Sequence, residues 1–164
     1  MAAPHVTVLN GPNLNLLGER EPHIYGATTL AEVDAAAIAR GKALGLDVTC
    51  HQSNHEGVLV DLIHTARKTS AAIVINPAGY SFFSIPLLDA LKTFDDPIVE
   101  LHISNIHARD ENHRHSKISG AATAVICGLG PYGYIAAIEA AAHLIAAVKG
   151  PLPTGTGTPG AKTA

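Results

Sequence analysis

Glu100 and His102 are the pair of side chains in this sequence whose types and spacing best suit acid–base chemistry. They stand two residues apart in the apolar run at 98–103 (IVELHI), and residues two apart in a β-strand point to the same face. A carboxylate beside an imidazole fixes its tautomer and favours its charged form. A histidine at a strand end is more often structural, but the neighbouring Glu100 and Ser104 favour a role in proton transfer.

Polar side chains also gather in segments that follow two other apolar runs. The segment at 10–26 is far longer than the few residues usual for such a connection, and it contains Arg20 and Tyr25, so it is predicted to be a lid. Asn76 directly follows another apolar run. Asn13 and Asn76 each stand beside a proline, and either a substrate contact or a local turn hydrogen bond would explain them.

Five β-branched runs are predicted to place these segments at one edge of a sheet: 5–10, 47–52, 71–75, 98–103 and 122–127. Helical patterns separate them. Two open with capping boxes, at Thr29 and Ser53, and two more begin near Ser84 and Tyr132. This alternation predicts an α/β fold with a parallel sheet and helices on both faces. We expect the flavodoxin-like, five-stranded order 2-1-3-4-5, in which a site forms beyond the carboxyl ends of the strands.

The composition excludes several classes of protein. The 164 residues are 47% hydrophobic and 15% charged, with a formal net charge of −3. The sequence has no basic run, so neither nucleic acid nor a membrane is expected as a partner. It shows no secretory signal pattern, which predicts a cytoplasmic location. Residues 1–149 are expected to form a single catalytic domain and 150–164, rich in Pro, Gly and Thr, a disordered tail. Cys50 and Cys127 are expected to be buried thiols rather than a disulfide.

The loop motifs resemble those of the type II 3-dehydroquinate dehydratases. The likeness rests on 9–14 (LNGPNL) with 20–26 (REPHIYG), on 75–77 (INP) and on 99–109 (VELHISNIHAR). It extends over roughly residues 5–148, in order and without large gaps. The resemblance implies a flavodoxin-like subunit, assembled as a homododecamer of four trimers. It also implies anti elimination of water from 3-dehydroquinate through an enolate to give 3-dehydroshikimate, with no metal and no cofactor.

The same resemblance implies a role for each reacting side chain. Tyr25 would be the base, and because the pKa of a tyrosine is ordinarily about 10, the guanidinium of Arg20 would favour its phenolate. His102 would protonate the departing hydroxyl, oriented by Glu100. Asn13 would hold a water that stabilises the enolate oxygen. The further contacts implied are Asn76, Ile103 and Ser104 on the substrate carboxylate, Arg109 as a second positive charge, and Asp89 from a neighbouring subunit.

Two positions depart from the family pattern. Phe82 stands where the family has histidine, and His113 where it has arginine; both family residues contact ring hydroxyls of the substrate. A buried hydroxyl left unpaired costs roughly 1–3 kcal/mol. These departures leave open a second function, a paralogous lyase or isomerase for a related, less hydroxylated cyclic carboxylate. Ala78 replaces the usual glycine, which matters if this residue has a positive φ.

Other interpretations have weaker support. The four histidines between 102 and 115 match no metal-ligand spacing. The G-x-G-x-x-G pattern at 128–133 lacks the following strand and acidic residue of a dinucleotide site, so it is expected to be a structural turn. A catalytically silent binding module is the remaining alternative, and the combination of Arg20, Tyr25, Glu100 and His102 disfavours it.

Overall fold

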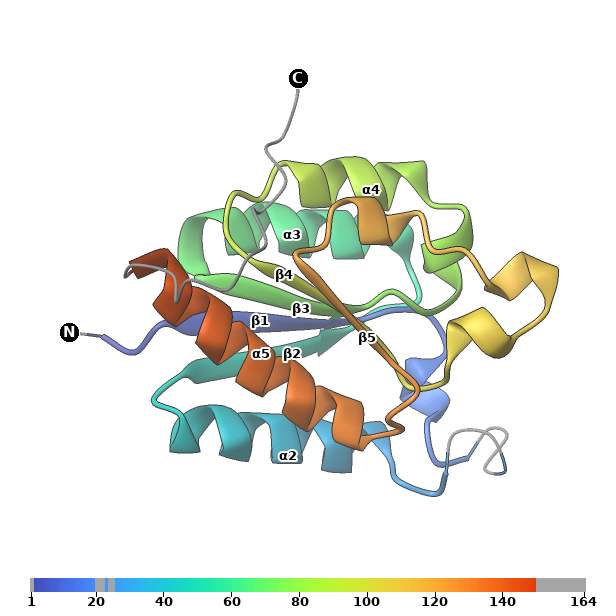
Figure 1. The fold of residues 1–164 in the computed structure, drawn as a ribbon, viewed down its shortest axis with the longest axis horizontal. Coiled ribbons are helices and arrows are strands. Elements are labelled where there is room, and N and C mark those ends of the chain that lie inside the picture. Colours follow the sequence, from blue (N-terminus) through green and yellow to red (C-terminus); the bar gives the residue numbers. More distant parts are fainter. Residues whose placement is uncertain (1, 20–22, 24–25, 150–164) are drawn as a thin grey trace, which may run out of the picture.

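A computed structural model describes residues 2–19, 23 and 26–149 (Figure 1). Within them, a parallel sheet of five strands has the order β2-β1-β3-β4-β5, which confirms the predicted flavodoxin-like order. The strands are β1 (His5–Asn10), β2 (Asp47–Gln52), β3 (Ala72–Asn76), β4 (Ile98–His102) and β5 (Ala124–Cys127). Arg20 and Tyr25, predicted for the lid, lie outside the described residues, as does the predicted tail at 150–164.

Helices cover both faces of the sheet, as predicted. α2 (Leu30–Ala43) and α5 (Tyr132–Lys149) pack on one face, and α3 (Glu56–Thr69) and α4 (Ile85–Lys92) on the other (Figure 1). Short 3-10 turns follow the strands or connect them: η1 (Leu14–Leu16), η2 (Ala78–Phe82), η3 (Ile106–Ala108), η4 (Glu111–His113) and η5 (Ile118–Gly120). Among the helices of the described ranges, none is both long enough and apolar enough to cross a membrane.

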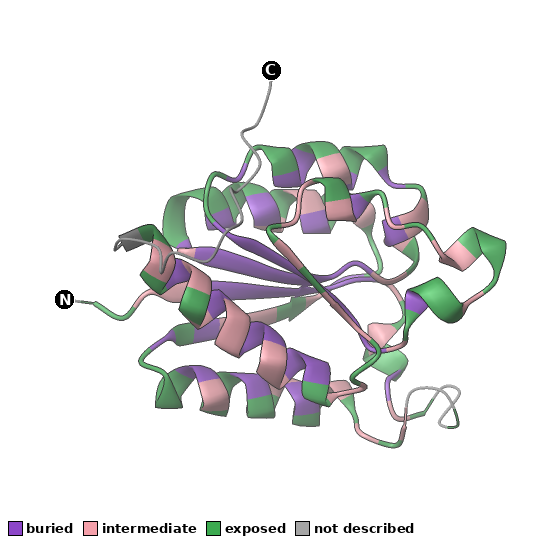
Figure 2. Ribbon diagram, viewed as in Figure 1, coloured by how far each residue is buried: buried purple, intermediate pink, exposed green. Residues whose placement is uncertain are grey.

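The sheet lies between two apolar cores (Figure 2). Alternate residues of a strand point to opposite faces. In β3, Val74 therefore belongs to the core beneath α2 and α5, whereas Ile73 and Ile75 belong to the core beneath α3 and α4. All three side chains are 0% exposed. Burial on both faces explains why the central strands are continuous apolar runs rather than alternating ones.

The capping box predicted at the start of α2 is confirmed. The backbone N–H of Glu32 donates to Thr29 Oγ1 (3.3 Å), and the backbone N–H of Thr29 donates to Glu32 Oε2 (2.8 Å). These bonds satisfy donors that the first turn of a helix leaves without partners. The start of α2 therefore lies where the local sequence predicts it.

The capping box predicted at Ser53 is wrong. α3 begins at Glu56 itself, so this carboxylate lies at the first helical position, too early to reach back as a capping box requires. It accepts a hydrogen bond from the Ser84 hydroxyl instead. Ser84 Oγ also accepts from Leu87 N at 3.0 Å and so caps α4. This tertiary contact fixes the starts of α3 and α4 together.

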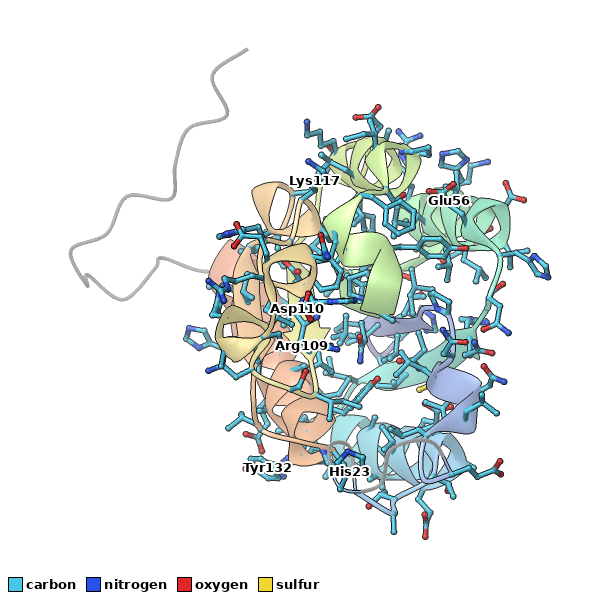
Figure 3. All side chains as sticks on the ribbon, turned by 90° about the vertical axis from the view of Figure 1, so that its right-hand side faces the viewer. His23, Glu56, Arg109, Asp110, Lys117 and Tyr132 are labelled. Atoms are coloured by element: carbon cyan, nitrogen blue, oxygen red, sulfur yellow. The ribbon has the colours of Figure 1, made fainter. Side chains whose placement is uncertain are left out.

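The polar segments named above meet at one edge of the sheet. Carboxyl ends of parallel strands lie at the same edge, which is on the right of Figure 1 and faces the viewer in Figure 3. Asn10, Asn76 and His102 are the last residues of β1, β3 and β4, and these three strands are neighbours in the sheet. The segments that follow them are therefore adjacent.

Candidate active site

A cavity of about 210 Å³ opens at the carboxyl edge of the sheet. Its walls come from the segments after β1, β3 and β4, the place where open α/β sheets bind ligands. Arg109, which lines it, lies near the middle of this edge in Figure 3. The predicted site residues that line the cavity are Asn13, Asn76, Phe82, His102, Ile103, Ser104, Arg109 and His113.

The Glu100–His102 pair lies at the end of β4. His102 Nε2 and Glu100 Oε1 are 2.6 Å apart, and the two residues are 4% and 0% exposed. The short separation agrees with the predicted common face of the strand. His102 lines the cavity, whereas Glu100 stands behind it, so the carboxylate acts on the cavity through the imidazole.

Two serines lie behind the Glu100 carboxylate, and one of them binds it. Ser119 Oγ donates to Glu100 Oε2 at 2.5 Å. Ser116 also faces the carboxylate, although its buried Oγ makes no hydrogen bond of standard geometry within the described part of the chain. Burial raises the pKa of Glu100, but polar side chains around it, which include hydrogen bonds from His102 and Ser119, outweigh burial, so the pKa lies below its ordinary value. The carboxylate is therefore charged at neutral pH.

A charged Glu100 fixes the tautomer of His102. The carboxylate accepts, so Nε2 carries the hydrogen that points to it. Nδ1 is then the nitrogen that is free to exchange a proton with a molecule in the cavity. This is the arrangement expected of a general acid or base held by a second group.

Asn13 has a left-handed backbone with φ of 68°, a conformation that asparagine tolerates better than most residues. Its backbone N–H donates to Asn54 Oδ1 at 2.9 Å. Its side chain makes no capping hydrogen bond to η1. The interpretation of Asn13 as a turn cap is therefore wrong, and its amide is left to the cavity that it lines.

Asn76 combines the two roles that the sequence left open. Its Oδ1 accepts from Ala78 N at 3.2 Å, which is a local turn bond, and it also lines the cavity. Its Nδ2 donates to Tyr134 Oη at 3.0 Å. Ala78 has φ of 49°, so the replacement of the usual glycine does place an L side chain in a strained conformation.

Ile103, Ser104 and Arg109 follow β4. Ile103 is buried, and Ser104 and Arg109 are half-buried. The backbone oxygen of Arg109 accepts two hydrogen bonds from the Arg114 guanidinium, at 3.0 and 2.8 Å. These bonds hold the backbone of Arg109, and Arg109 itself forms part of the cavity wall.

Phe82 and His113, the two departures from the family pattern, both line the cavity. His113 Nδ1 lies 2.8 Å from each carboxylate oxygen of Asp110. This hydrogen bond holds the pKa of Asp110 below its ordinary value. Asp110 thus binds His113, in a pair that is far more exposed than Glu100–His102.

Other predicted residues lie away from the cavity. Asp89 is exposed on α4 and does not line it. Cys50 and Cys127 are free thiols that are half-buried rather than buried. Over residues 2–19, 23 and 26–149, no three His, Cys, Asp or Glu side chains are grouped to hold a metal ion.

The glycine-rich turn at 128–133 joins β5 to α5. A Cβ at Gly133 would lie 2.8 Å from Leu101 Cδ1. A close contact between α5 and β4 thus accounts for the glycine at position 133.

Comparisons with known proteins agree on one family. Residues 4–142 match the family model described as Dehydroquinase class II. The chain is 56% identical over 141 residues to a catabolic 3-dehydroquinase of Verticillium alfalfae, covering 86% of this chain and 94% of that one. It is 54% identical to a 3-dehydroquinate dehydratase of Caulobacter vibrioides, covering 87% and 97%. The crystal structure of type II dehydroquinase from Propionibacterium acnes superposes with a TM-score of 0.82 at 45% identity, covering 85% and 96%.

Proposed function

The chain belongs to the class II dehydroquinase family, and from this premise we propose that it is a hydro-lyase that removes water from 3-dehydroquinate to give 3-dehydroshikimate. Relatives named for this substrate share half or more of their residues with it over nearly their whole length. The observation that carries the proposal is the buried Glu100–His102 pair at the floor of a cavity lined by amides and a guanidinium.

The elimination divides into two proton transfers. A base removes the proton from a carbon beside the ketone, and the electrons of that bond form an enolate. The enolate then expels the hydroxyl group of the next carbon, which takes a proton from His102 and leaves as water. The new double bond is conjugated with the ketone. Tyr25, assisted by Arg20, is the proposed base, and both are carried over from the family motif.

His102 suits the second transfer. With Nε2 bound to Glu100, its Nδ1 is the nitrogen available to the leaving hydroxyl. Positioned acids of this kind contribute roughly 10²–10⁴-fold to a rate.

The remaining cavity residues bind charge on the substrate. The amide of Asn13 is the proposed anchor for a water on the enolate oxygen. Asn76, with Ile103 and Ser104 at the end of β4, is proposed to bind the carboxylate. The guanidinium of Arg109 adds the positive charge that an anionic substrate and an enolate both require.

Turnover of 3-dehydroquinate, followed by the ultraviolet absorbance of the conjugated enone, tests the proposal. His102→Ala and Tyr25→Phe should each lower kcat about 10²–10⁴-fold while the circular dichroism spectrum is unchanged. His107→Ala is the matched control, because His107 is exposed on the same segment and does not line the cavity. A wild-type chain that does not turn over 3-dehydroquinate would sink the proposal.

Phe82 and His113 support a second candidate, a lyase or isomerase acting on a related ring with fewer hydroxyl groups. They form part of the cavity wall and contact each other. An aromatic wall favours apolar ring carbons over hydroxyl groups. A panel of cyclic carboxylates assayed beside 3-dehydroquinate separates the two candidates by kcat/KM.

We further propose that 1–149 is a single catalytic domain, that it works in the cytoplasm, and that it assembles as a homododecamer of four trimers. Asp89 is then free to reach a neighbouring subunit's site, since it is exposed on α4. Phe83, just before this helix, and Ile85, its first residue, are 64% and 49% exposed. Exposed apolar side chains of this size favour burial in an assembly. Sedimentation analysis of the wild type gives the subunit number.

A further inference from the structure

Four polar side chains run from the cavity through the buried centre of the molecule to α2. Asn76 Nδ2 donates to Tyr134 Oη at 3.0 Å, Tyr134 Oη donates to Asn10 Oδ1 at 2.7 Å, and Asn10 Nδ2 reaches Asp34 Oδ1 at 3.5 Å. Asn76, Tyr134 and Asn10 are 3%, 1% and 0% exposed. They come from β3, α5 and β1. Three elements that are far apart in the sequence are thus connected by one buried chain of hydrogen bonds.

Asp34, at the end of the chain of hydrogen bonds farthest from the cavity, sets which group donates in each bond. A carboxylate accepts hydrogen bonds, so Asn10 must turn its Nδ2 to Asp34. Its Oδ1 then faces Tyr134, which must donate to it. The oxygen of Tyr134 is left to accept, and Asn76 supplies the N–H. Burial and the charge of Asp34 raise the pKa of Tyr134, so its hydroxyl keeps the proton that it donates.

A hydrogen bond at the cavity end favours the same orientation of the Asn76 amide. Its Oδ1 accepts from the backbone N–H of Ala78 at 3.2 Å. A flipped amide would set its NH₂ group against that N–H and its oxygen against the lone pairs of Tyr134. Two donors or two acceptors facing each other in a buried place are costly. The amide therefore has one favourable orientation, in which its second N–H is left for the cavity.

We propose that Tyr134 is a positioning residue which, held by Asn10 and Asp34, locks the Asn76 amide so that it presents an N–H group to the substrate carboxylate. The inference rests on the proposed function for the identity of that substrate. A carboxylate accepts and would be repelled by the Asn76 carbonyl, so the orientation of this amide decides whether Asn76 binds or repels. Tyr134 itself does not line the cavity and acts through Asn76.

Tyr134→Phe removes the hydroxyl and keeps the ring that fills the core. KM for 3-dehydroquinate should rise about tenfold, the order expected for one misaligned hydrogen bond to a charged group, while kcat stays within about twofold. Thr7→Val is the matched control. It also removes a buried hydroxyl, which is 2.7 Å from Ser70 Oγ, but Thr7 does not line the cavity. It should lower the melting temperature and leave KM unchanged.

A double-mutant cycle separates positioning from general loosening of the core. In an Asn76→Ala background, Tyr134→Phe should change KM less than about twofold, because no amide remains to be oriented. An equal change in both backgrounds, or an unchanged KM in the single variant, would overturn the inference. Asp34→Asn is a second variant for the case that Tyr134→Phe does not fold. The new amide can donate as well as accept, so it no longer forces Asn10 to donate to it. The orientations of Asn10, Tyr134 and Asn76 are then less strictly set, and KM should rise a few-fold.

The crystal structure of Tyr134→Phe gives a readout that does not depend on the substrate. The hydrogen bonds around Asn76 should show a rotated or doubled amide. If the Asn76 amide of Tyr134→Phe keeps the single wild-type orientation, the inference is contradicted, whatever the activity of the wild type. Absence of wild-type turnover of 3-dehydroquinate would count only against the proposed function.

Discussion

Phe82 and His113 pack edge to face, with ring centroids 5.3 Å apart and ring planes inclined at 82°. They belong to two different segments, η2 and η4, and both line the cavity. His113 Nδ1 is bound to Asp110, so its Nε2 is the nitrogen left for a ligand. Phe82 and His113 therefore form one aromatic wall of the cavity, in which His113 supplies a single free ring nitrogen.

The variant Phe82→His/His113→Arg tests what this wall does. One recovered hydrogen bond is worth about 1–1.5 kcal/mol, so the double variant should lower KM for 3-dehydroquinate up to about tenfold and leave kcat within a few-fold. Steady-state kinetics of the wild type, both single variants and the double variant measure this. A rise in kcat/KM of several orders of magnitude would favour the second candidate function, because the wild-type wall would then be suited to another ring.

Glu100→Gln should lower kcat at least tenfold and destabilise the fold by about 2 kcal/mol near neutral pH, because a neutral amide binds His102 and Ser119 less strongly than a carboxylate does. The stability change should depend on pH. Burial raises the pKa of Glu100 but its hydrogen bonds outweigh this, so the folded-state pKa lies below 4.5. Its stabilisation is present above about pH 4.5 and is lost as the pH falls through the folded-state pKa.

Denaturant unfolding of wild type and Glu100→Gln from pH 7 down to pH 3 measures this difference. The two curves should converge at acid pH. Glu56→Gln is a suitable control, since Glu56 also accepts a hydrogen bond from a serine but lies at the start of α3, away from the cavity. It should leave kcat unchanged. A constant gap between wild type and Glu100→Gln at all pH values would contradict a charged carboxylate.

The sequence predicted those features that depend on local pattern. β-branched runs alternating with helical segments specify a parallel sheet, and the spacing of Glu100 and His102 places them on one face of a strand. Tyr134 and Asn10 were not predicted, because they are 124 positions apart and neither lies in a motif that indicates the other. A tyrosine in an otherwise apolar stretch of helix was the available signal, since a buried hydroxyl requires a partner.

One error of prediction has a tertiary origin. The interpretation of Ser53 as a helix cap failed because Glu56 is used by Ser84, a tertiary contact that no local pattern reports. The sequence left two roles open for Asn13, and its side chain makes no capping hydrogen bond to η1. Local propensities predict which residues are available, and packing decides how they are used.

Ala78→Gly should stabilise the chain by about 1 kcal/mol, because an L residue at φ of 49° is strained by roughly that amount relative to glycine. Thermal unfolding should show a rise of a few degrees. Gly79→Ala is the matched comparison, since a Cβ there meets nothing within 4 Å and its φ lies outside the left-handed range. It should not lower the melting temperature. A lower melting temperature for Ala78→Gly would show that the strain at this residue is small.

Gly11 lies where the segments after β1 and β3 touch. Its backbone N–H donates to Asn76 O at 2.8 Å, and a Cβ at this position would lie 2.5 Å from the carbonyl oxygen of Pro77. Because the obstacle is backbone rather than a flexible side chain, Gly11→Ala must push the two segments apart. Asn13 lies in the first segment and Asn76 directly precedes the second, so both binding and stability depend on this contact.

We expect Gly11→Ala to cost about 1–3 kcal/mol of stability and to lower kcat/KM for 3-dehydroquinate at least tenfold, since displacement of a binding group by about 1 Å can cost 10²-fold. Gly57→Ala is the control: Gly57 lies inside α3 with nothing within 4 Å of an added Cβ, so alanine there should add about 0.5–1 kcal/mol of stability and leave kinetics unchanged. Calorimetry and enone absorbance measure both effects. Wild-type kinetics in Gly11→Ala would mean that the cavity does not need these two segments in contact.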